Sequence, residues 1–324
     1  MARALLTDMT APIVIGIDLG GTKTEVVALE RNALRGAELP PPMFRRRVST
    51  PAGDYTGTVT LLLALAHEAA AACAGRTVAG VGLGTPGARS RATGLLKNSN
   101  STALNGRPLY EDVARRLGFP LAMANDANCF ALAEARFGAG GGARVVAGII
   151  LGTGMGGGIV IDGRALDGHE GIAGEWGHVA LDAAGPLCYC GRRGCLETYL
   201  SGPGMAQRFA ARHGQTLTAE EIWAASRAPA HPLHTAAAAA ADDYLEWFGR
   251  GVALILNVLD PDVVVLGGGL SQVERLYTDG PARVAAHLFS DRLATPIRRP
   301  ALGDAAGVFG AALLAAAPDG IWAD

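Results

Sequence analysis

The sequence predicts an α/β protein, because stretches with the pattern of β-strands alternate with stretches of helical periodicity. Residues 12–29 and 145–161 each consist of an apolar, β-branched run, a glycine-rich turn and a second such run, which is the pattern of a β-hairpin. A further strand over 263–266 is followed by three glycines. The likeness of the two hairpins is what an internal duplication would produce. With no linker between the parts, we expect two halves packed around a cleft.

Length and charge narrow the class of protein. The chain has 324 residues, which suggests about two domains with a sizeable core. A formal net charge of -2 gives no reason to expect nucleic acid or an anionic membrane as a partner. The uncharged stretch 145–161 is shorter than the ~20 residues of a membrane span, and the N-terminus lacks a signal-peptide pattern. We therefore expect a cytoplasmic protein.

The turn of the first hairpin has the composition of a phosphate cradle. It contains Asp18, Gly20, Gly21, Thr22 and Lys23. The spacing of a Walker loop is absent and a strand follows, so phosphate would be bound by successive backbone N–H groups. A plain hairpin turn is the alternative.

Segments between the hairpins alternate between helix and strand. Residues 55–74 have leucines at helical spacing, and the strand predicted over 78–83 ends in a Gly-Thr-Pro-Gly turn that contains Gly87. Ligands of open α/β sheets gather at the carboxyl ends of strands, although such a turn alone is weak support for a site. The polar segment 98–106 contains Asn105, which either binds a polar ligand or forms a turn. Residues 109–117 are predicted to form a short helix.

Asp126 lies where the predicted strand 121–123 gives way to a helical pattern over 129–137. Two interpretations are open for this residue. Asp and Asn are favoured helix N-caps, so a structural role is sufficient to explain it. The functional alternative is a catalytic base held at the carboxyl end of a strand.

The second hairpin and the C-terminal half continue the pattern. Two further glycine turns follow strands, and they consist of Gly152, Thr153 and Gly154, and of Gly267, Gly268 and Gly269. Residues 206–253 are rich in alanine and predicted to be mostly helical, with a loop near 229–232. A buried helix over 249–258 and a last apolar helix over 308–316 complete the set.

The segment from 174 to 197 has the donor set of a zinc site. His178 is followed by Cys188, Cys190 and Cys195, and one His with three thiolates is a common tetrahedral ligand set. Clustered cysteines in an otherwise cysteine-poor chain favour metal over a disulfide framework. Ordinary buried thiols beside a hydrogen-bonded histidine are the alternative. A metal here would also fix the flanking acids, Glu175 and Glu197.

Taken together, these motifs resemble those of the ROK family of bacterial sugar kinases and repressors. The resemblance runs from about Ile13 to Ala312 and is weakest between Ala210 and Asp243. Its most specific part is the complete signature Cys-x-Cys-Gly-x2-Gly-Cys-x-Glu over 188–197. The other matching stretches are Asp18 to Lys23, Asn125 to Asn128, Gly152 to Gly158, Gly174 to His178 and Gly267 to Gly269.

The resemblance implies an actin-like/hexokinase (ribonuclease H-like) ATPase fold in which two domains close over a sugar and ATP. We expect an N-terminal domain over 12–122, completed by a helix over 306–318. A C-terminal domain over 123–305 would carry the zinc-binding loop 178–195. The family likeness also favours a homodimer.

The resemblance further implies a role for each candidate residue. Asp126 would be the catalytic base that accepts the proton of the sugar hydroxyl. The residues expected to bind ATP and Mg²⁺ are Asp18, Gly20, Gly21, Thr22, Lys23, Gly152, Thr153, Gly154, Gly267, Gly268 and Gly269. Those expected to bind the sugar are Gly87, Asn105, Asn125, Asp126, Glu175, His178 and Glu197. His178 would bind structural zinc through one ring nitrogen and face the sugar with the other.

Within the family, the sequence is most similar to bacterial fructokinases that also accept mannose. We therefore expect ATP-dependent phosphorylation of the 6-hydroxyl of fructose. The alternatives are an N-acetylglucosamine kinase, a glucokinase or a mannokinase. Two other classes of protein are alternatives to a sugar kinase, namely a sugar-responsive repressor and an ATPase acting as a chaperone or scaffold. A repressor would need a helix-turn-helix, and only about a dozen residues precede the first strand.

Overall fold

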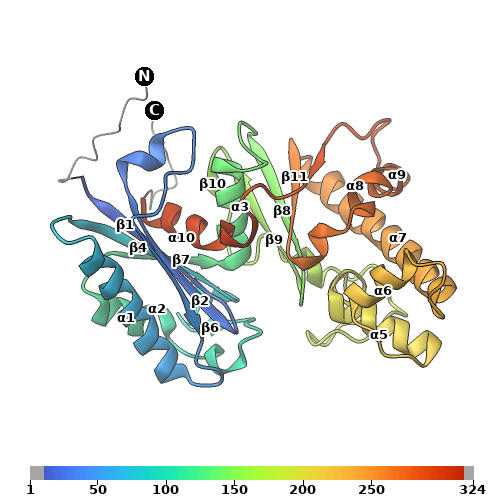
Figure 1. Ribbon diagram of the computed structural model, residues 1–324, viewed down its shortest axis with the longest axis horizontal. Helices are drawn as coiled ribbons and strands as arrows, with labels where there is room; N and C mark the ends of the chain where they lie inside the picture. Colours follow the sequence, from blue (N-terminus) through green and yellow to red (C-terminus); the bar gives the residue numbers. More distant parts are fainter. Residues whose placement is uncertain (1–10, 317–324) are drawn as a thin grey trace. The chain divides into compact units, whose positions relative to one another are not determined.

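The computed structural model describes residues 11–316, which form two compact units (Figure 1). Residues 11–138, 163–173 and 304–316 belong to the first unit, and residues 139–162 and 174–303 to the second. The first unit contains a complete five-stranded sheet with helices. The second unit contains four of the five strands of another sheet, also with helices, so the predicted α/β class is confirmed. The division differs from the predicted domain boundaries, because residues 123–138 and 163–173 group with the first unit.

The first sheet has the strand order β3-β2-β1-β4-β7. Its strands are β1 (Ile13–Leu19), β2 (Lys23–Glu30), β3 (Phe44–Ser49), β4 (Val78–Thr85) and β7 (Leu121–Asn125). β1 runs antiparallel to β2 and parallel to β4, and β4 runs parallel to β7. The carboxyl ends of β1, β4 and β7 therefore share one edge, where Asp18 pairs with Gly84 and Thr85 pairs with Asn125.

Helices cover both faces of this sheet. α1 (Tyr55–Ala72) and α2 (Leu109–Leu117) pack on one face, where their leucines and valines form the core with β1, β2 and β4. α10 (Ala306–Ala316) packs on the opposite face against β1, β4 and α3 (Asp126–Phe137) (Figure 1). The short hairpin β5 (Ala88–Arg89) and β6 (Leu96–Lys97) follows β4. Of the predicted last helix 306–318, residues 317 and 318 lie outside the described residues.

Glycines let α10 lie directly on the sheet backbone. A Cβ added at Gly82 would be 1.7 Å from the carbonyl oxygen of Ala311, and one added at Gly16 would be 2.3 Å from that of Val308. No side chain fits in such a space. The glycines of β1 and β4 are therefore packing positions as well as strand residues.

The second sheet has the order β10-β9-β8-β11-β12. Its strands are β8 (Val145–Leu151), β9 (Met155–Ile161), β10 (Arg164–Ala165), β11 (Val263–Gly267) and β12 (Ile297–Arg298). β8 pairs antiparallel with β9, as predicted for the second hairpin, and parallel with β11. The glycine turns after β8 and β11 consequently lie at the same edge of the sheet.

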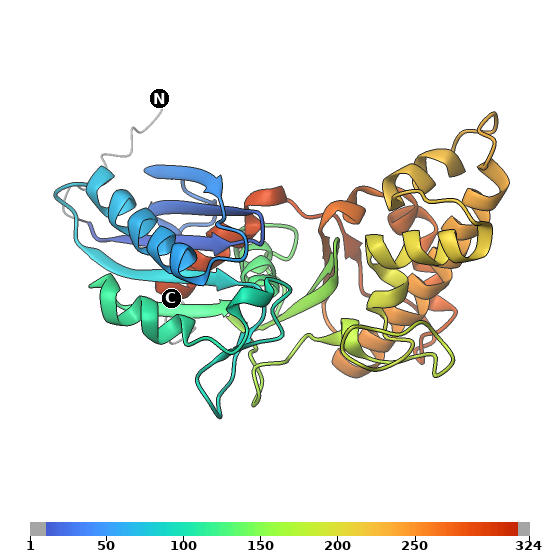
Figure 2. The same cartoon turned by 90° about the horizontal axis from the view of Figure 1, so that it is seen from below.

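Helices make up most of the rest of the second unit. They are α4 (Glu197–Leu200), α5 (Gly202–His213), α6 (Ala219–Ser226), α7 (His234–Leu259), α8 (Arg275–Thr278) and α9 (Gly280–Ala285). Figure 2 shows α5, α6 and α7, in yellow to orange, packed beside one another. The predicted buried helix 249–258 is the C-terminal part of the long α7, which ends at Asp260 in a left-handed conformation (φ 46°). Among residues 11–316, no helix combines the length and apolar character needed to cross a bilayer.

Candidate active site and metal centre

Asp126 is the first residue of α3, directly after β7. The helix cap is Asn125, whose Oδ1 accepts a hydrogen bond from the Ala127 N–H at 2.8 Å. An Oδ1 of Asp126 accepts from the same N–H at 2.8 Å. The N-terminal end of a helix favours a negative charge, so this position stabilises Asp126 as a carboxylate.

Asp18 lies at the carboxyl end of β1 and is half-buried. Burial, together with the nearby carboxylates of Asp126 and Glu25, raises the pKa of Asp18 to about 7, while Arg47 opposes that shift. Such a carboxylate would be stabilised by a cation. Gly307 at the start of α10 leaves room for the Asp18 carboxylate, because a Cβ at Gly307 would lie 2.5 Å from Asp18 Oδ2. The position and charge of Asp18 fit the predicted role of holding Mg²⁺.

The turn between β1 and β2 is closed by backbone bonds. The Gly20 N–H donates to the Lys23 carbonyl at 3.0 Å, and the Thr50 hydroxyl donates to the Gly20 carbonyl at 2.8 Å. The three predicted phosphate-contacting residues Gly21, Thr22 and Lys23 are exposed. This arrangement is compatible with a ligand at the turn, and the phosphate role stays a prediction.

The sequence analysis did not predict the charged cluster behind this turn. Glu25 on β2 is buried and pairs with Arg45 and Arg47 of β3, at 2.6 Å and 2.5 Å. Glu25 also pairs with Asp18 in the register of β1 and β2. The two arginines thus offset the negative charge beside Asp18. The alternation of charged and apolar residues in β2 and β3 would have placed these side chains together only if their register had been known.

Of the predicted sugar residues in the first unit, two are in contact. The Asn125 Nδ2 donates to the Gly87 carbonyl at 3.3 Å, and Gly87 has a positive φ of 81°. Asn105 lies farther along the loop and holds Ser99, accepting from its N–H and donating to its carbonyl, both at 2.8 Å. The turn-forming interpretation of Asn105 therefore accounts for its contacts within the described chain. Its role toward a sugar stays a prediction.

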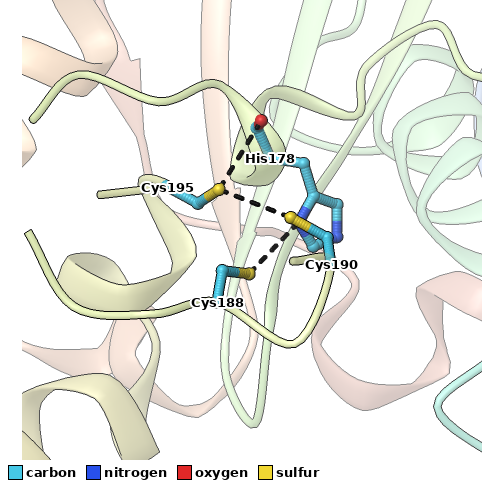
Figure 3. Close-up of side chains that lie close together, drawn as sticks. All are labelled: His178, Cys188, Cys190 and Cys195. Atoms are coloured by element: carbon cyan, nitrogen blue, oxygen red, sulfur yellow. Dashed lines mark hydrogen bonds between the residues drawn. The ribbon is translucent and has the colours of Figure 1, made fainter. Parts of the chain in front are cut away.

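The four predicted metal ligands of the second unit converge (Figure 3). The ligand atoms of His178, Cys188, Cys190 and Cys195 all lie within 4.8 Å of one another. The Cys190 and Cys195 sulfurs are 3.6 Å apart, and the Cys188 sulfur is 3.6 Å from His178 Nδ1. Metal–sulfur bonds of about 2.3 Å in a tetrahedron require ligand separations of about 3.8 Å. The donor set and spacing thus fit a four-coordinate zinc ion.

The loop has the backbone that this convergence requires. Gly191 and Gly194 adopt left-handed conformations, with φ of 85° and 67°. A Cβ at Gly194 would lie 1.7 Å from the Asp182 carbonyl oxygen, so a side chain there is excluded. Burial raises the pKa of Cys195 to about 12, and a thiol in that state becomes a ligand when a divalent cation displaces its proton. Four protein ligands leave no open position, which is typical of a structural zinc site.

The second ring nitrogen of His178 has a partner in this structure. His178 Nε2 is 2.9 Å from the Tyr189 hydroxyl, and the two rings meet edge to face at 5.1 Å. Metal-bound histidines usually bond a second partner in this way, which fixes the ring orientation. The predicted contact of Nε2 with a sugar would require Tyr189, which is 72% exposed, to move or to share that nitrogen. This role of His178 stays a prediction.

Glu197 is the predicted sugar residue nearest the glycine turn of the second hairpin. Its Oε2 accepts a hydrogen bond from the Met155 N–H at 3.2 Å, and a Cβ added at Gly154 would be 2.9 Å from the same oxygen. Glu175, half-buried, precedes the short 3-10 turn that carries His178. Both acids therefore belong to the chain segments that the metal would fix.

A cavity of about 570 Å³ lies beside the glycine turns of the second unit. Gly152 and Thr153 line it from one turn, and Gly268 and Gly269 from the other. Gly154 and Gly267 do not line this space. Gly268 is a glycine of necessity, because its φ is 78° and a Cβ would lie 2.4 Å from the Leu151 carbonyl oxygen.

The remaining wall of this cavity was not predicted. Most of it comes from the N-terminal parts of α5 and α6 with the cap of α6, and Ile150 and Leu270 complete it. The helix residues are Gly202, Pro203, Ala206, Thr218, Ala219 and Glu220. Thr218 and Glu221 form a reciprocal capping box at the start of α6. The Thr-x-x-Glu pattern was visible in the sequence and would have located this helix start. Helix N-termini facing a cavity suit a phosphate-bearing ligand.

Comparisons with known proteins agree with the family resemblance noted in the sequence. A model of the ROK family matches residues 14–317. An N-acetyl-D-glucosamine kinase of Photobacterium profundum is 39% identical over 315 residues, covering 92% of this chain and 98% of that protein. An N-acetylgalactosamine kinase of Shewanella sp. (strain ANA-3) is 37% identical and covers 92% of this chain and 95% of its own.

Solved structures agree in fold. A ROK hexokinase from Thermus thermophilus has a TM-score of 0.81 and 30% identity, covering 93% of this chain and 97% of its own. A ROK glucokinase from Streptomyces griseus in complex with glucose and AMPPNP has a TM-score of 0.73 and 29% identity, covering 93% and 98%. The predicted actin-like/hexokinase fold is confirmed.

Proposed function

The chain belongs to the ROK family, and we propose that it is an ATP-dependent kinase that phosphorylates the 6-hydroxyl of an N-acetylhexosamine, with N-acetylglucosamine preferred. The observation that carries this proposal is the 39% identity to an N-acetyl-D-glucosamine kinase over nearly the full length of both chains. Similar kinases of Pectobacterium atrosepticum and Yersinia pseudotuberculosis carry the same name.

Fructose, the hexose that the sequence analysis expected first, is not supported by these comparisons. The relatives from Photobacterium profundum and Shewanella sp. (strain ANA-3), which match over 92% of the chain, are named as kinases of N-acetylated amino sugars. The alternative substrate of the sequence analysis, N-acetylglucosamine, is therefore better supported.

In the proposed reaction, Asp126 accepts the proton of the sugar hydroxyl as that oxygen attacks the terminal phosphate of ATP. A hydroxyl is a poor nucleophile, and a positioned carboxylate contributes typically 10²–10⁴-fold to the rate. The position of Asp126 at the start of α3 supports this role, because a helix N-terminus favours a negative charge and the Ala127 N–H donates to the Asp126 Oδ1.

The remaining chemistry of phosphoryl transfer is positioning and neutralisation of charge. Mg²⁺, when bound, would neutralise the phosphate charge, and Asp18 is the residue we propose to hold it. The half-buried carboxylate with its raised pKa supports this assignment. We assign the nucleotide to the 570 Å³ cavity beside the glycine turns, where Gly152, Thr153, Gly268 and Gly269 would contact it. Lys23, Gly154 and Gly267 stay candidates for binding ATP, although none of them lines this cavity.

Zinc has a structural part in this proposal. His178, Cys188, Cys190 and Cys195 would hold it, and it would fix the loop that carries Glu175 and Glu197. These acids and His178 are the groups of the second unit that we propose to bind sugar hydroxyls.

A coupled assay that measures ADP release tests the proposal. The panel contains N-acetylglucosamine, N-acetylgalactosamine, N-acetylmannosamine, glucose, mannose and fructose at equal concentration with ATP and Mg²⁺. We expect the highest kcat/KM with N-acetylglucosamine. A higher kcat/KM with fructose or glucose would overturn the substrate assignment, and no sugar-dependent ADP release would overturn kinase activity.

Three further expectations belong to the proposal. A homodimer would be detected by light scattering at micromolar concentration, and a monomer would contradict it. Cytoplasmic location would be tested by cell fractionation. A repressor of the same family would bind DNA, so a sugar-sensitive mobility shift with genomic fragments would favour that function over the kinase.

A further inference from the structure

A row of charged residues crosses three strands of the first sheet and begins at Asp18. In the register of these strands, Asp18 of β1 is opposite Glu25 of β2, and Glu25 is opposite Arg47 of β3. Directly opposite residues point to the same face of a sheet, so the three side chains share one face. It is the face covered by α10, because a Cβ at Gly307 would meet the Asp18 carboxylate. Since neighbouring strands are about 4.8 Å apart, the Cα atoms of Asp18 and Arg47 are only about 10 Å apart.

The guanidinium of Arg47 is held by one edge. Its Nε and Nη2 both donate to Glu25 Oε2, at 3.0 Å and 2.5 Å. Glu25 is only 5% exposed, and its other oxygen accepts from Arg45 Nε at 2.6 Å. A guanidinium has five N–H donors, and the remaining three of Arg47 have no partner among residues 11–316. The Arg47 side chain is 40% exposed, so a ligand can reach this second edge.

Arg45 differs from Arg47 in its surroundings although it pairs with the same carboxylate. It is opposite Val27, two residues farther along β3, and its guanidinium lies over the ring of Phe309 at 6.0 Å from the centroid. Arg47 is the arginine whose charge acts on Asp18. The arginine that can serve a ligand beside Asp18 is therefore Arg47.

The charges of the cluster favour an anion once a cation is bound. The hydrogen bond to Glu25 raises the pKa of Arg47 against the opposing effect of burial, and the charges of Asp304 and Asp18 also raise it. With all groups ionised, the three acids and the two arginines Arg45 and Arg47 sum to -1. Mg²⁺ on Asp18, as proposed above, would make the sum +1. An incoming phosphate is then attracted to the row.

The phosphate concerned is the one that is transferred. Asp126, the proposed base, is close enough for its charge to act on Asp18. The sugar hydroxyl that Asp126 deprotonates attacks the terminal phosphate, so this phosphate must lie beside the same carboxylates. A guanidinium suits it, because the planar fork of an arginine matches two phosphate oxygens at once.

We infer that Arg47 binds the terminal phosphate of ATP through the free edge of its guanidinium, and that Glu25 aims this edge. The inference rests on the proposed kinase function. It adds Arg47 as a binding residue and Glu25 as a positioning residue that acts through Arg47. Neither was singled out by the sequence analysis.

The test is Arg47→Gln, studied by calorimetry with two nucleotides in the presence of Mg²⁺. The β,γ-imido analogue of ATP has a terminal phosphate, and ADP lacks it. We expect the affinity for the analogue to fall about 10–100-fold, because a charge-assisted hydrogen bond is lost. The affinity for ADP should change less than about threefold. In the coupled assay, kcat/KM for MgATP should fall by at least the same factor as the affinity for the analogue.

Arg45→Gln is the matched control. Arg45 makes an equally close ion pair with Glu25 and is 43% exposed, but it lies outside the row. Each of the two variants leaves Glu25 with one arginine, so both should fold, which thermal melting checks. Arg45→Gln should keep both nucleotide affinities within about threefold. An equal loss of analogue affinity in Arg45→Gln would overturn the inference, because the effect would then belong to Glu25 alone.

Two more variants keep the inference testable if Arg47→Gln does not fold. Arg47→Lys keeps the charge but lacks the fork, and it should bind the analogue about three- to tenfold more weakly than wild type. Glu25→Gln removes the charged anchor of Arg47. It should also weaken the analogue and not ADP, because the guanidinium is no longer aimed.

The outcomes separate the inference from the function on which it rests. Wild-type protein that binds neither nucleotide overturns the proposed kinase, and with it this inference. Wild-type kinase whose folded Arg47→Gln and Arg47→Lys variants keep full affinity for the analogue overturns the inference alone. A loss of affinity for the analogue and for ADP alike does the same, because the contact would not be with the terminal phosphate.

Discussion

Replacing Gly307 by alanine should damage the function of Asp18 without damaging the fold. Gly307 is the second residue of α10, and a Cβ there would lie 2.5 Å from Asp18 Oδ2 and 2.9 Å from its Cγ. The nearest atoms belong to a side chain and not to backbone, so the carboxylate can move aside. The backbone of Gly307 carries no positive φ, and alanine is the better helix former by up to about 1 kcal/mol.

The size of the effect follows from the distance. An ordinary contact begins at 3.4 Å, so the Asp18 carboxylate must shift by about 0.9 Å. A misplacement of about 1 Å at a catalytic position can cost on the order of 100-fold in rate. We therefore expect kcat/KM for MgATP to fall about 30–100-fold, while the thermal midpoint stays within about 2 °C of wild type or rises.

The assay is steady-state kinetics with varied Mg²⁺ and ATP, next to thermal melting of the same preparation. Gly80→Ala is the matched control, because it also faces α10 but its Cβ would be 3.4 Å from the Ala315 carbonyl oxygen. Gly80→Ala should keep both activity and stability. A folded Gly307→Ala protein with wild-type kinetics would refute the assignment of Asp18 to Mg²⁺ and phosphate.

Four other changes test the site. Asp126→Asn should lower kcat about 10²–10⁴-fold with little change in sugar affinity by calorimetry, and a near-normal kcat would remove it as the base. Cys190→Ser should release zinc, measured by elemental analysis, whereas Cys73→Ser, outside the cluster, should keep it. Wild-type protein that is purified without chelator and contains no metal would contradict the zinc site. Tyr189→Phe should weaken zinc about tenfold in a chelator competition, because the ligand histidine loses its second partner, and an unchanged affinity would deny that role. Without Mg²⁺, Asp18→Asn should be more stable than wild type, because the folded-state pKa of about 7 lies above the ordinary aspartate pKa of 3.8. Wild type therefore loses stability as the pH rises between these values. That advantage should grow up to about pH 7 and then level off, and a pH-independent difference in thermal midpoint would contradict it.

The sequence predicted the structure best where the interacting residues are close together in the chain. Four ligands within residues 178–195 and two glycines at fixed places predicted the convergence seen in the loop. The hairpin predicted over 145–161 likewise corresponds to β8 and β9, because both strands are consecutive in the chain; β8 matches the predicted strand, whereas β9 begins at Met155, inside the stretch predicted as the glycine turn. In each case the contacts that decide the structure are only a few residues apart.

Contacts between distant segments were not predictable in the same way. Gly82 appears in the sequence as one glycine in an apolar strand, and its reason becomes visible only when the Ala311 carbonyl lies against it. The pair of Asn128 and Asp167, 39 residues apart, is of the same kind. The substrate was missed for a related reason, since similarity in the shared zinc and glycine motifs does not separate one hexose from another.

The predicted zinc site and the glycine turn at 152–154 are connected through a short path of the second unit. Cys195 is followed by α4, which begins at Glu197, and that carboxylate accepts the Met155 N–H beside the turn at 152–154. At the other end of α4, the Gly202 N–H donates to the Gly152 carbonyl at 2.8 Å. The first residue of α4 and the first residue of α5, which follows it closely, therefore both hold the glycine turn that lines the 570 Å³ cavity. Because Cys195 lies directly before α4, a structural metal in this loop would set the shape of the proposed nucleotide site as well as the position of the acids assigned to the sugar.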